Sequence, residues 1–287
     1  MGDLHLHDFE AIKVHAQLSS RGVELPDCLY EPDGDTFVPT GLTRGPWDRN
    51  FQHAGPPAAL LAHAVERAGQ VEPGQAGRLA YDILRPVPLA PHRIETRTVR
   101  PGRNVEQIEA TLLDAESGDA LMRLSAWRLR VEALELPQGL GEPDPPPPPP
   151  ESGESSLPKF WTEPVAYHAA LDWRFTHGEF DAPGPAACWT RLKVPLVRGE
   201  PATPLERLLV MADAASGISH VLDWQEWVFI NVELGIHLER APEGEWMAMD
   251  ATTRLGPDGA GLCTSTLSDE RGRVGVSTQT LRVAKQR

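Results

Sequence analysis

A run of six prolines divides the chain into two parts of similar length. Pro145 to Pro150 lie in the segment 136–160, LPQGLGEPDPPPPPPESGESSLPKF, which is also rich in Gly, Ser and acidic residues. Consecutive prolines form an extended polyproline II helix, which can neither continue an α-helix nor pair inside a sheet. We therefore expect an N-terminal unit at 1–135, a Pro-rich linker at 136–160 and a C-terminal unit at 161–287. Binding to the aromatic groove of a partner is the alternative role of this tract.

The two units end in similar sequences, which indicates an internal duplication. The first ends in TLLDAESGDALMRLSAWRLRVEA and the second in TSTLSDERGRVGVSTQTLRVAK. Each reads as a strand, a tight turn and a closing strand that finishes with Leu-Arg-Val. When the Leu-Arg-Val triplets at 129–131 and 281–283 are aligned, Trp127 falls opposite Gln279. The polar residue at this position is therefore peculiar to the second unit.

Each unit also contains one apolar segment of helical length. The segments GPPAALLAHAVERAG at 55–69 and LERLLVMADAASGISHVL at 205–222 carry apolar side chains over most of the helix circumference. Segments 92–100 and 245–254 have the alternating pattern of strands. One long helix against a run of antiparallel strands in each unit predicts an α+β fold.

A narrow polar stripe interrupts the second helical segment. Glu206, Asp213 and His220 are spaced seven residues apart, and Gly217 lies beside them. A solvated helix face explains this stripe. A pocket explains it as well, because the residues around Asp213 are Ala, Ser and Gly, which leave space for a ligand. The pattern alone makes Asp213 a candidate for acid–base chemistry.

Composition limits the partners and the compartment. The formal net charge is −14, with 27 Lys and Arg against 41 Asp and Glu, so we expect neither nucleic acid nor an anionic membrane as the main partner. No apolar run reaches the roughly 18 residues of a membrane span. The first 20 residues lack the basic start and apolar core of a signal peptide. Cys28, Cys188 and Cys263 form no C-x-x-C pair. We expect a cytoplasmic protein.

Motifs of several other site classes are missing from the sequence. It contains no G-x-S-x-G, no G-x-G-x-x-G and no P-loop. The HLH at 5–7 is the nearest approach to a metal-binding pattern, and its place near the chain terminus argues against that role. We expect neither a metal nor a cofactor.

Several segments together resemble the acyl-CoA thioesterase II family. The similarity lies in NFQHAGPPAALLAHAVE at 50–66, in AYDILRPVPLAPHRIETRTVRPGRN at 80–104, and in the helix, first strand and closing strand of the second unit. It covers nearly the whole chain apart from the linker. The resemblance implies a double hotdog fold, in which two antiparallel sheets are each wrapped around a long central helix.

The resemblance also implies an activity and a site. Members hydrolyse fatty acyl-CoA with an Asp, a Thr or Ser, and a Gln from the second hotdog. The matching positions of this chain hold Asp213, Asn231 and Gln279. Asn231 departs from the family's Thr or Ser, although its amide can still donate and accept hydrogen bonds. Asp213 would act as general base on a water that Asn231 and Gln279 hold in place.

Four further residues are candidates for substrate binding. His53 and Gly55 lie at the entry to the first helix, and Gly217 lies close to Asp213. Arg103 follows a strand with alternating arginines that could meet the phosphates of CoA. A satisfied loop histidine and a solvated sheet face explain His53 and the arginines as well.

Two other functions remain open at this point. A double hotdog that binds acyl-CoA or lipid without hydrolysis is one, and Asn231 is its main support. A hotdog hydratase is the other, but the sequence lacks a D-x-N-x-x-H pattern. Hotdog sheets commonly pair edge to edge, which this chain could achieve between its own two halves or in a homo-oligomer.

Overall fold

The computed structural model describes residues 24–140 and 144–286. The predictions that concern the N-terminal segment, including HLH at 5–7, lie outside the described residues. No helix in the described ranges is long and apolar enough to cross a bilayer.

The chain folds as two runs of strands, each with helical segments before or between them. The first run comprises β1 (Tyr30–Asp33), β2 (Thr36–Pro39), η1 (Gly41–Thr43), α2 (Gly55–Ala68), β3 (Gly74–Ile83), β4 (His92–Arg100), β5 (Val105–Asp114) and β6 (Ala120–Arg130). The second run comprises η3 (Tyr167–Ala170), β7 (Leu171–His177), β8 (Ala186–Leu192), α3 (Pro204–Ala212), α4 (Ala215–Ile218), β9 (Trp227–Asn231), β10 (Glu233–Leu238), β11 (Trp246–Leu255), β12 (Ala260–Asp269) and β13 (Gly272–Lys285), and η2 (Pro150–Ser152) lies between the two runs.

The strands form one continuous sheet, where the sequence predicts two. The order is β1-β2-β4-β5-β6-β3-β10-β13-β12-β11-β8-β7, with β9 paired to β13. All pairs between these strands are antiparallel. The halves join where β3 pairs with β10, with Ala80 opposite Gly235. Joining these edges satisfies backbone groups that two separate sheets would leave unpaired.

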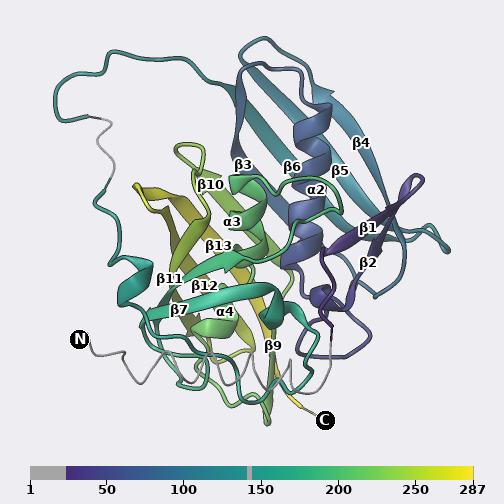
Figure 1. The fold of residues 1–287 in the computed structure, drawn as a ribbon, viewed down its shortest axis with the longest axis vertical. Coiled ribbons are helices and arrows are strands. Elements are labelled where there is room, and N and C mark those ends of the chain that lie inside the picture. Colours follow the sequence, from purple (N-terminus) through teal and green to yellow (C-terminus); the bar gives the residue numbers. More distant parts are fainter. Residues whose placement is uncertain (1–23, 141–143, 287) are drawn as a thin grey trace.

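The first predicted helix is confirmed as α2. Two prolines at its start fix a helical φ without loss of a hydrogen bond, and nine of its 14 residues are buried. One side of α2 packs on β4, β5 and β6, and another packs against α3 (Figure 1). The helix therefore lies between its own part of the sheet and the second half of the molecule.

The second predicted helix is shorter than expected. Thr203 and Glu206 form a capping box at the start of α3, but the helix ends at Ala212 and Asp213 is its C-cap. The four-residue α4 follows after Ala214. Glu206, Asp213 and His220 are all buried, so the stripe is not a solvated face.

The alignment of the two closing strands on Leu-Arg-Val is wrong by one residue, because it places buried side chains of one strand opposite outward-facing side chains of the other. In β6 the side chains of Leu124, Ala126 and Arg128 are buried, whereas in β13 those of Ser277 and Gln279 are. A one-residue shift moves every side chain of a strand to the other face. Trp127 is therefore not the structural counterpart of Gln279.

The described part of the proline tract lies against the second half of the molecule. The Trp189 indole donates a hydrogen bond to the Pro148 carbonyl over 2.6 Å, and Pro150 is buried. Glu154 forms a bridge with Phe175 of β7. Pro145, Pro146, Pro148 and Pro149 remain exposed, so the tract is an exposed connection that contacts the second half at Pro148 and Pro150.

Candidate active site

A cavity of about 650 Å³ lies where the two halves meet. Its wall comes from the loop 45–54, from residues 83–87 at and after the end of β3, from the segment 160–180, from residues 213–217 after α3, and from β9. Asp213 and Asn231 line it, as do His53 and Gly217. Gln279 is fully buried behind Asp213 and does not line it.

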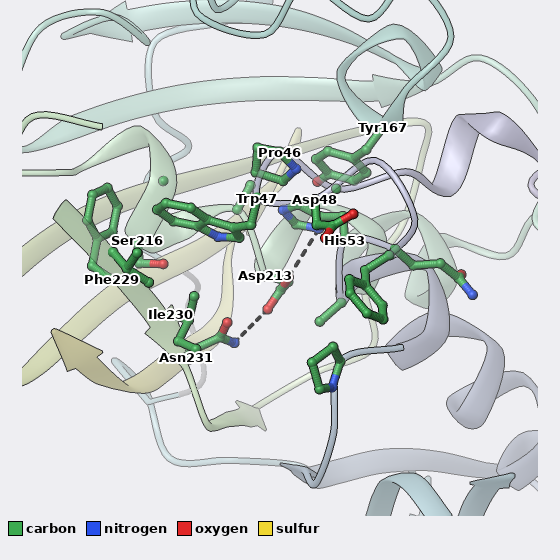
Figure 2. A pocket seen from close by; sticks show the side chains of 18 of the residues that line it. Pro46, Trp47, Asp48, His53, Tyr167, Asp213, Ser216, Phe229, Ile230 and Asn231 are labelled. Carbon is green, nitrogen blue, oxygen red and sulfur yellow. Dashed lines mark hydrogen bonds and ion pairs between the residues drawn. The ribbon is translucent and has the colours of Figure 1, made fainter. Parts of the chain in front are cut away.

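The Asp213 carboxylate sits at the centre of a small hydrogen-bonded cluster (Figure 2). Its Oδ1 accepts from Asn231 Nδ2 at 2.8 Å and from Gln279 Nε2 at 3.2 Å. Its Oδ2 lies 3.1 Å from His53 Nδ1. A carboxylate has about four acceptor positions, so these three contacts leave one for a further donor.

Gln279 occupies the break between α3 and α4. Its Nε2 donates to the Asp213 carbonyl at 2.9 Å, and its Oε1 accepts from the Ser216 amide at 3.0 Å. Helix ends leave such carbonyl and amide groups without helical partners, and a buried one is costly unless paired. The side chain therefore stabilises the break and fixes the direction in which Asp213 points.

Asn231 reaches Asp213 from the neighbouring strand. It is the last residue of β9 and pairs with Leu281 of β13, two residues beyond Gln279. The three residues that the family resemblance brings forward are thus in mutual contact through Asp213, although 66 positions separate Asp213 from Gln279.

His53 is held by the loop that precedes α2. Its backbone amide donates to Thr43, and its ring stacks on Tyr167 with centroids 3.7 Å apart. The neighbouring Gln52 is fixed by Tyr30, whose hydroxyl donates over 2.6 Å, and by the Pro88 carbonyl. These contacts place the imidazole against Asp213 from the opposite half of the chain.

Burial favours the neutral form of the His53 imidazole. Burial lowers the pKa of His53 below its ordinary value, and the nearby Asp213 charge offsets this only in part. Nδ1 lies 3.1 Å from the Asp213 carboxylate and 3.2 Å from the Gly55 amide nitrogen. The same ring atom can therefore donate to Asp213 or accept from Gly55, according to its tautomer.

Tyr167 is a site residue that the sequence analysis missed. Besides stacking on His53, its hydroxyl donates to the Val210 carbonyl in the last turn of α3 over 2.7 Å. It thus links the His53 loop to the helix that carries Asp213. No periodicity or motif marks this residue, because both contacts depend on the tertiary fold.

Gly55 serves helix packing and does not line the cavity. A methyl group at this position would overlap the backbone carbonyl oxygen of Val210. Because α2 and α3 are antiparallel neighbours, this close approach sets the separation between His53 and Asp213. The residue predicted to bind substrate therefore acts on the site through the helix pair.

We expect Gly55→Ala to lower the free energy of unfolding by about 1–3 kcal/mol, as overpacking against rigid backbone does. Gly217→Ala is the matched control, because its new methyl group would meet only the Trp224 ring at 3.7 Å, an ordinary contact. Urea denaturation of both variants measures the difference. Equal stabilities would show that α2 and α3 do not approach as described.

Of the predicted substrate-binding residues Gly217 and Arg103, only Gly217 lines the cavity. Gly217 lines the cavity in α4, opposite Trp224. Arg103 lies in the turn between β4 and β5 and is not among the residues around the cavity. The turn follows the last residue of β4, and the nine residues of this strand place it about 30 Å from His92 at the start of the strand. The structure does not bring Arg103 to the site.

Buried histidines give the stability of the protein a pH dependence. Burial, with a contribution from Lys193, lowers the pKa of His168 to about 4, and burial also lowers the pKa values of His53, His92 and His220. Between the ordinary value of 6.5 and about 4, the unfolded chain binds a proton at His168 that the folded protein does not. The free energy of unfolding should therefore fall as the pH drops through this window, by up to about 1.4 kcal/mol per pH unit for this residue.

Replacement of His168 tests this dependence. We expect His168→Leu to lose less stability than the wild type between pH 7 and pH 5 in urea denaturation. A slope unchanged by the substitution would contradict the assignment.

A second cavity of about 500 Å³ lies at the other end of the α2–α3 pair. His63 Nδ1 lies 2.9 Å from Glu206 Oε1 on its wall. This His–carboxylate pair joins α2 to α3 directly, whereas His53 precedes α2 and Asp213 is the C-cap of α3. It offers a control for substitutions at the first cavity.

One group in the described ranges has the spacing of a metal site, and its surroundings argue against that role. Asp27, Cys28 and Glu31 lie within reach of one ion, but Arg198 forms ion pairs with both carboxylates. Burial, with the Glu31 charge, raises the pKa of the Cys28 thiol to about 11, which disfavours the thiolate that a metal needs.

Comparison with protein families gives two matches that together span most of the chain. The acyl-CoA thioesterase N-terminal domain matches residues 43–129, and the acyl-CoA thioesterase C-terminal domain matches residues 140–283. No curated protein matches the chain.

Comparison with solved structures shows the hot dog fold. A protein from Thermobifida fusca assigned as a thioesterase II is 22% identical, with a TM-score of 0.68 over 88% of this chain and 94% of that one. A conserved protein of unknown function with the hot dog fold, from Alicyclobacillus acidocaldarius, is 17% identical, with a TM-score of 0.66 over 91% and 97%. An acyl-CoA thioesterase II, TesB2, from Mycobacterium marinum is 16% identical, with a TM-score of 0.63 over 90% and 96%.

Proposed function

The chain belongs to the acyl-CoA thioesterase family, and from that premise we propose that it hydrolyses an acyl-CoA to the free acid and CoA. The observation that carries the proposal is the cluster around Asp213, a buried carboxylate on the wall of a large and mostly apolar cavity. Family resemblance favours a fatty acyl group.

Asp213 is the proposed general base. A water that donates to the remaining acceptor position of its carboxylate attacks the thioester carbon, and the proton passes to Asp213. The carbon–sulfur bond then breaks, and the proton returns to the thiolate to give CoA. No covalent acyl–enzyme intermediate is required, because a thioester carbonyl is already electrophilic.

Asn231 and Gln279 are proposed to orient the base. Both donate to Asp213 Oδ1, which leaves Oδ2 facing His53 and the cavity side of the cluster. Since Gln279 does not line the cavity, it acts through Asp213 and the helix break. Asn231 lines the cavity and could also contact the attacking water, the role that the resemblance assigns to Thr or Ser.

The start of α2 supports the negative charge that develops on the thioester oxygen. Helix N-termini carry partial positive charge and free amide donors. Pro56 and Pro57 have no amide hydrogen, and the Gly55 amide lies 3.2 Å from His53 Nδ1, so this support comes from the helix dipole and not from a direct amide hydrogen bond.

We also propose a cytoplasmic location, as the sequence predicts. Cys28, Cys188 and Cys263 are all buried as free thiols, which suits a reducing compartment.

Release of free thiol from acyl-CoAs of different acyl groups tests the function. We expect turnover of at least one thioester by the wild-type protein. Saturable acyl-CoA binding without any turnover would favour the non-catalytic alternative, and absence of both would reject an acyl-CoA site altogether.

A further inference from the structure

The aromatic side chains of this protein concentrate at the first cavity. The cavity wall holds four of the 8 Trp residues, one of the 3 Tyr and four of the 7 Phe. Half of the Trp, Tyr and Phe side chains of the chain thus surround one cavity, and this enrichment bears on the kind of ligand that the cavity binds.

The buried part of the wall is a set of rings in fixed orientations. Tyr167, Trp173 and Phe180 are all buried and line the cavity. Trp173 meets Phe180 edge to face, with centroids 4.8 Å apart and planes at 70°, and meets Tyr167 at 6.1 Å and 71°. Aromatic rings prefer such edge-to-face arrangements. A further ring in the cavity would extend this arrangement, whereas an alkyl chain would gain contact area alone.

The more exposed part of the wall holds tryptophans whose polar groups are unused. Trp161 and Trp224 line the cavity, and their buried indole N–H groups have no hydrogen-bond partner within the described ranges. A buried, unpaired donor is unfavourable, and Leu or Phe would avoid it. Trp161 and Trp224 therefore contribute a large aromatic surface to the cavity wall, and not a hydrogen bond. Trp224 stacks on Phe160 with centroids 4.5 Å apart.

The charges at the cavity argue against a second carboxylate on the acyl group. Arg85 is the one Lys or Arg side chain that lines the cavity among the described residues, and it lies 3.5 Å from Asp119. Asp48 and Asp213 add negative charge to the wall. An uncharged acyl group fits these surroundings.

The acyl group faces the buried wall, because the large and charged CoA must reach solvent. We propose that this acyl group is aromatic, an uncharged arylalkanoyl group in preference to a straight fatty chain. This inference rests on the proposed function. It replaces the fatty chain that the family resemblance favours.

Three thioesters with nine acyl carbons test the inference: 3-phenylpropanoyl-CoA, 3-cyclohexylpropanoyl-CoA and nonanoyl-CoA. Edge-to-face contacts contribute roughly a two- to tenfold factor in affinity. We expect kcat/KM for the phenyl thioester to exceed both others at least about threefold. Nonanoyl and cyclohexyl groups bury more apolar surface, so hydrophobicity alone predicts the opposite order. An equal or higher kcat/KM for nonanoyl-CoA would overturn the inference while leaving the thioesterase function intact.

A wall variant shows whether the rings cause the preference. Phe180→Leu keeps an apolar side chain and removes one ring from the buried wall, so the phenyl-to-nonanoyl ratio should fall about threefold. An unchanged ratio in the folded variant would also overturn the inference. The wild-type ratio stands on its own if the variant does not fold.

Binding of the free acids separates this inference from the proposed function. If no thioester is cleaved, the function fails, and calorimetry with 3-phenylpropanoate and nonanoate still measures the preference. Binding of the aryl acid at least about threefold more tightly would uphold the aromatic specificity. Equal or weaker binding of the aryl acid would overturn it.

Discussion

Asp213→Asn should reduce thioester hydrolysis by roughly 100- to 10,000-fold, the range that general-base catalysis contributes. The fold should remain, because the asparagine oxygen can still accept from Asn231 and Gln279, which contact Oδ1 in the wild type. Its amide can donate to His53 Nδ1, which lies 3.1 Å from the present Oδ2. Proton acceptance is the property that the substitution removes. The measurement is thiol release at saturating acyl-CoA.

Glu206→Gln is the matched control for this experiment. It changes a buried carboxylate of the same helix that contacts a histidine of α2, His63, but it does so at the second cavity. The control should retain hydrolysis close to that of the wild type. Equal losses in both variants would mean that the effect comes from helix stability, and full activity of Asp213→Asn would place the base elsewhere.

Arg128→Met should lower the free energy of unfolding by about 3–5 kcal/mol, because it leaves a buried carboxylate without its cation. Arg128 is 2% exposed, and it pairs with Glu106, which is 1% exposed, and with Glu66 at 3.0 Å. Glu106 also accepts hydrogen bonds from the Gln70 and Val71 amides just after α2. This ion pair therefore ties the end of α2 to β5 and β6.

The double variant Glu106→Gln/Arg128→Met distinguishes the loss of a pair from the loss of packing. With the charge also removed from position 106, the double variant should be more stable than Arg128→Met alone.

Burial alone would raise the pKa of the Glu106 carboxyl, but the Val71 and Gln70 amides and Arg128 outweigh it and hold the pKa below the ordinary value. Its contribution should be present above that ordinary value and be lost as the pH falls through the lowered one. Urea denaturation at neutral pH tests the first point, and urea denaturation over a series of pH values that descends below 4.5 tests the second.

Local patterns predicted the elements whose boundaries depend on local chemistry. The segment 55–69 became α2, which begins at Gly55 and ends at Ala68, because its prolines and apolar residues specify a buried helix with a defined start. The segment 92–100 became β4 without a shift. The segment 245–254 became β11, shifted by one residue.

Other features depended on partners distant in the sequence. The break after Ala212 cannot be read from an apolar segment, because Gln279 supplies the groups that stabilise it. The union of two sheets through β3 and β10 likewise follows from an edge pairing between the halves. The predicted match of Trp127 with Gln279 was wrong because an aligned Leu-Arg-Val triplet does not determine which face of a strand is buried.

The candidate site was predictable in part. Asp213 stood out as a carboxylate among small residues, and the family resemblance added Asn231 and Gln279, which the structure places in contact with it. The approach of His53 to Asp213 joins residues of opposite halves, and no spacing reveals it. Arg103 was a candidate through its neighbours on a strand, and the length of that strand carries it away from the cavity.

Hydrolysis in ¹⁸O-labelled water tests the central claim, that Asp213 activates water without forming a covalent intermediate. After many turnovers, mass spectrometry of the product acid and of the peptide containing Asp213 locates the label. Direct attack by water predicts one ¹⁸O atom in each acid molecule formed and none in the peptide. Label in the Asp213 carboxylate, or an acyl group attached to the protein in a quenched reaction, would contradict the claim.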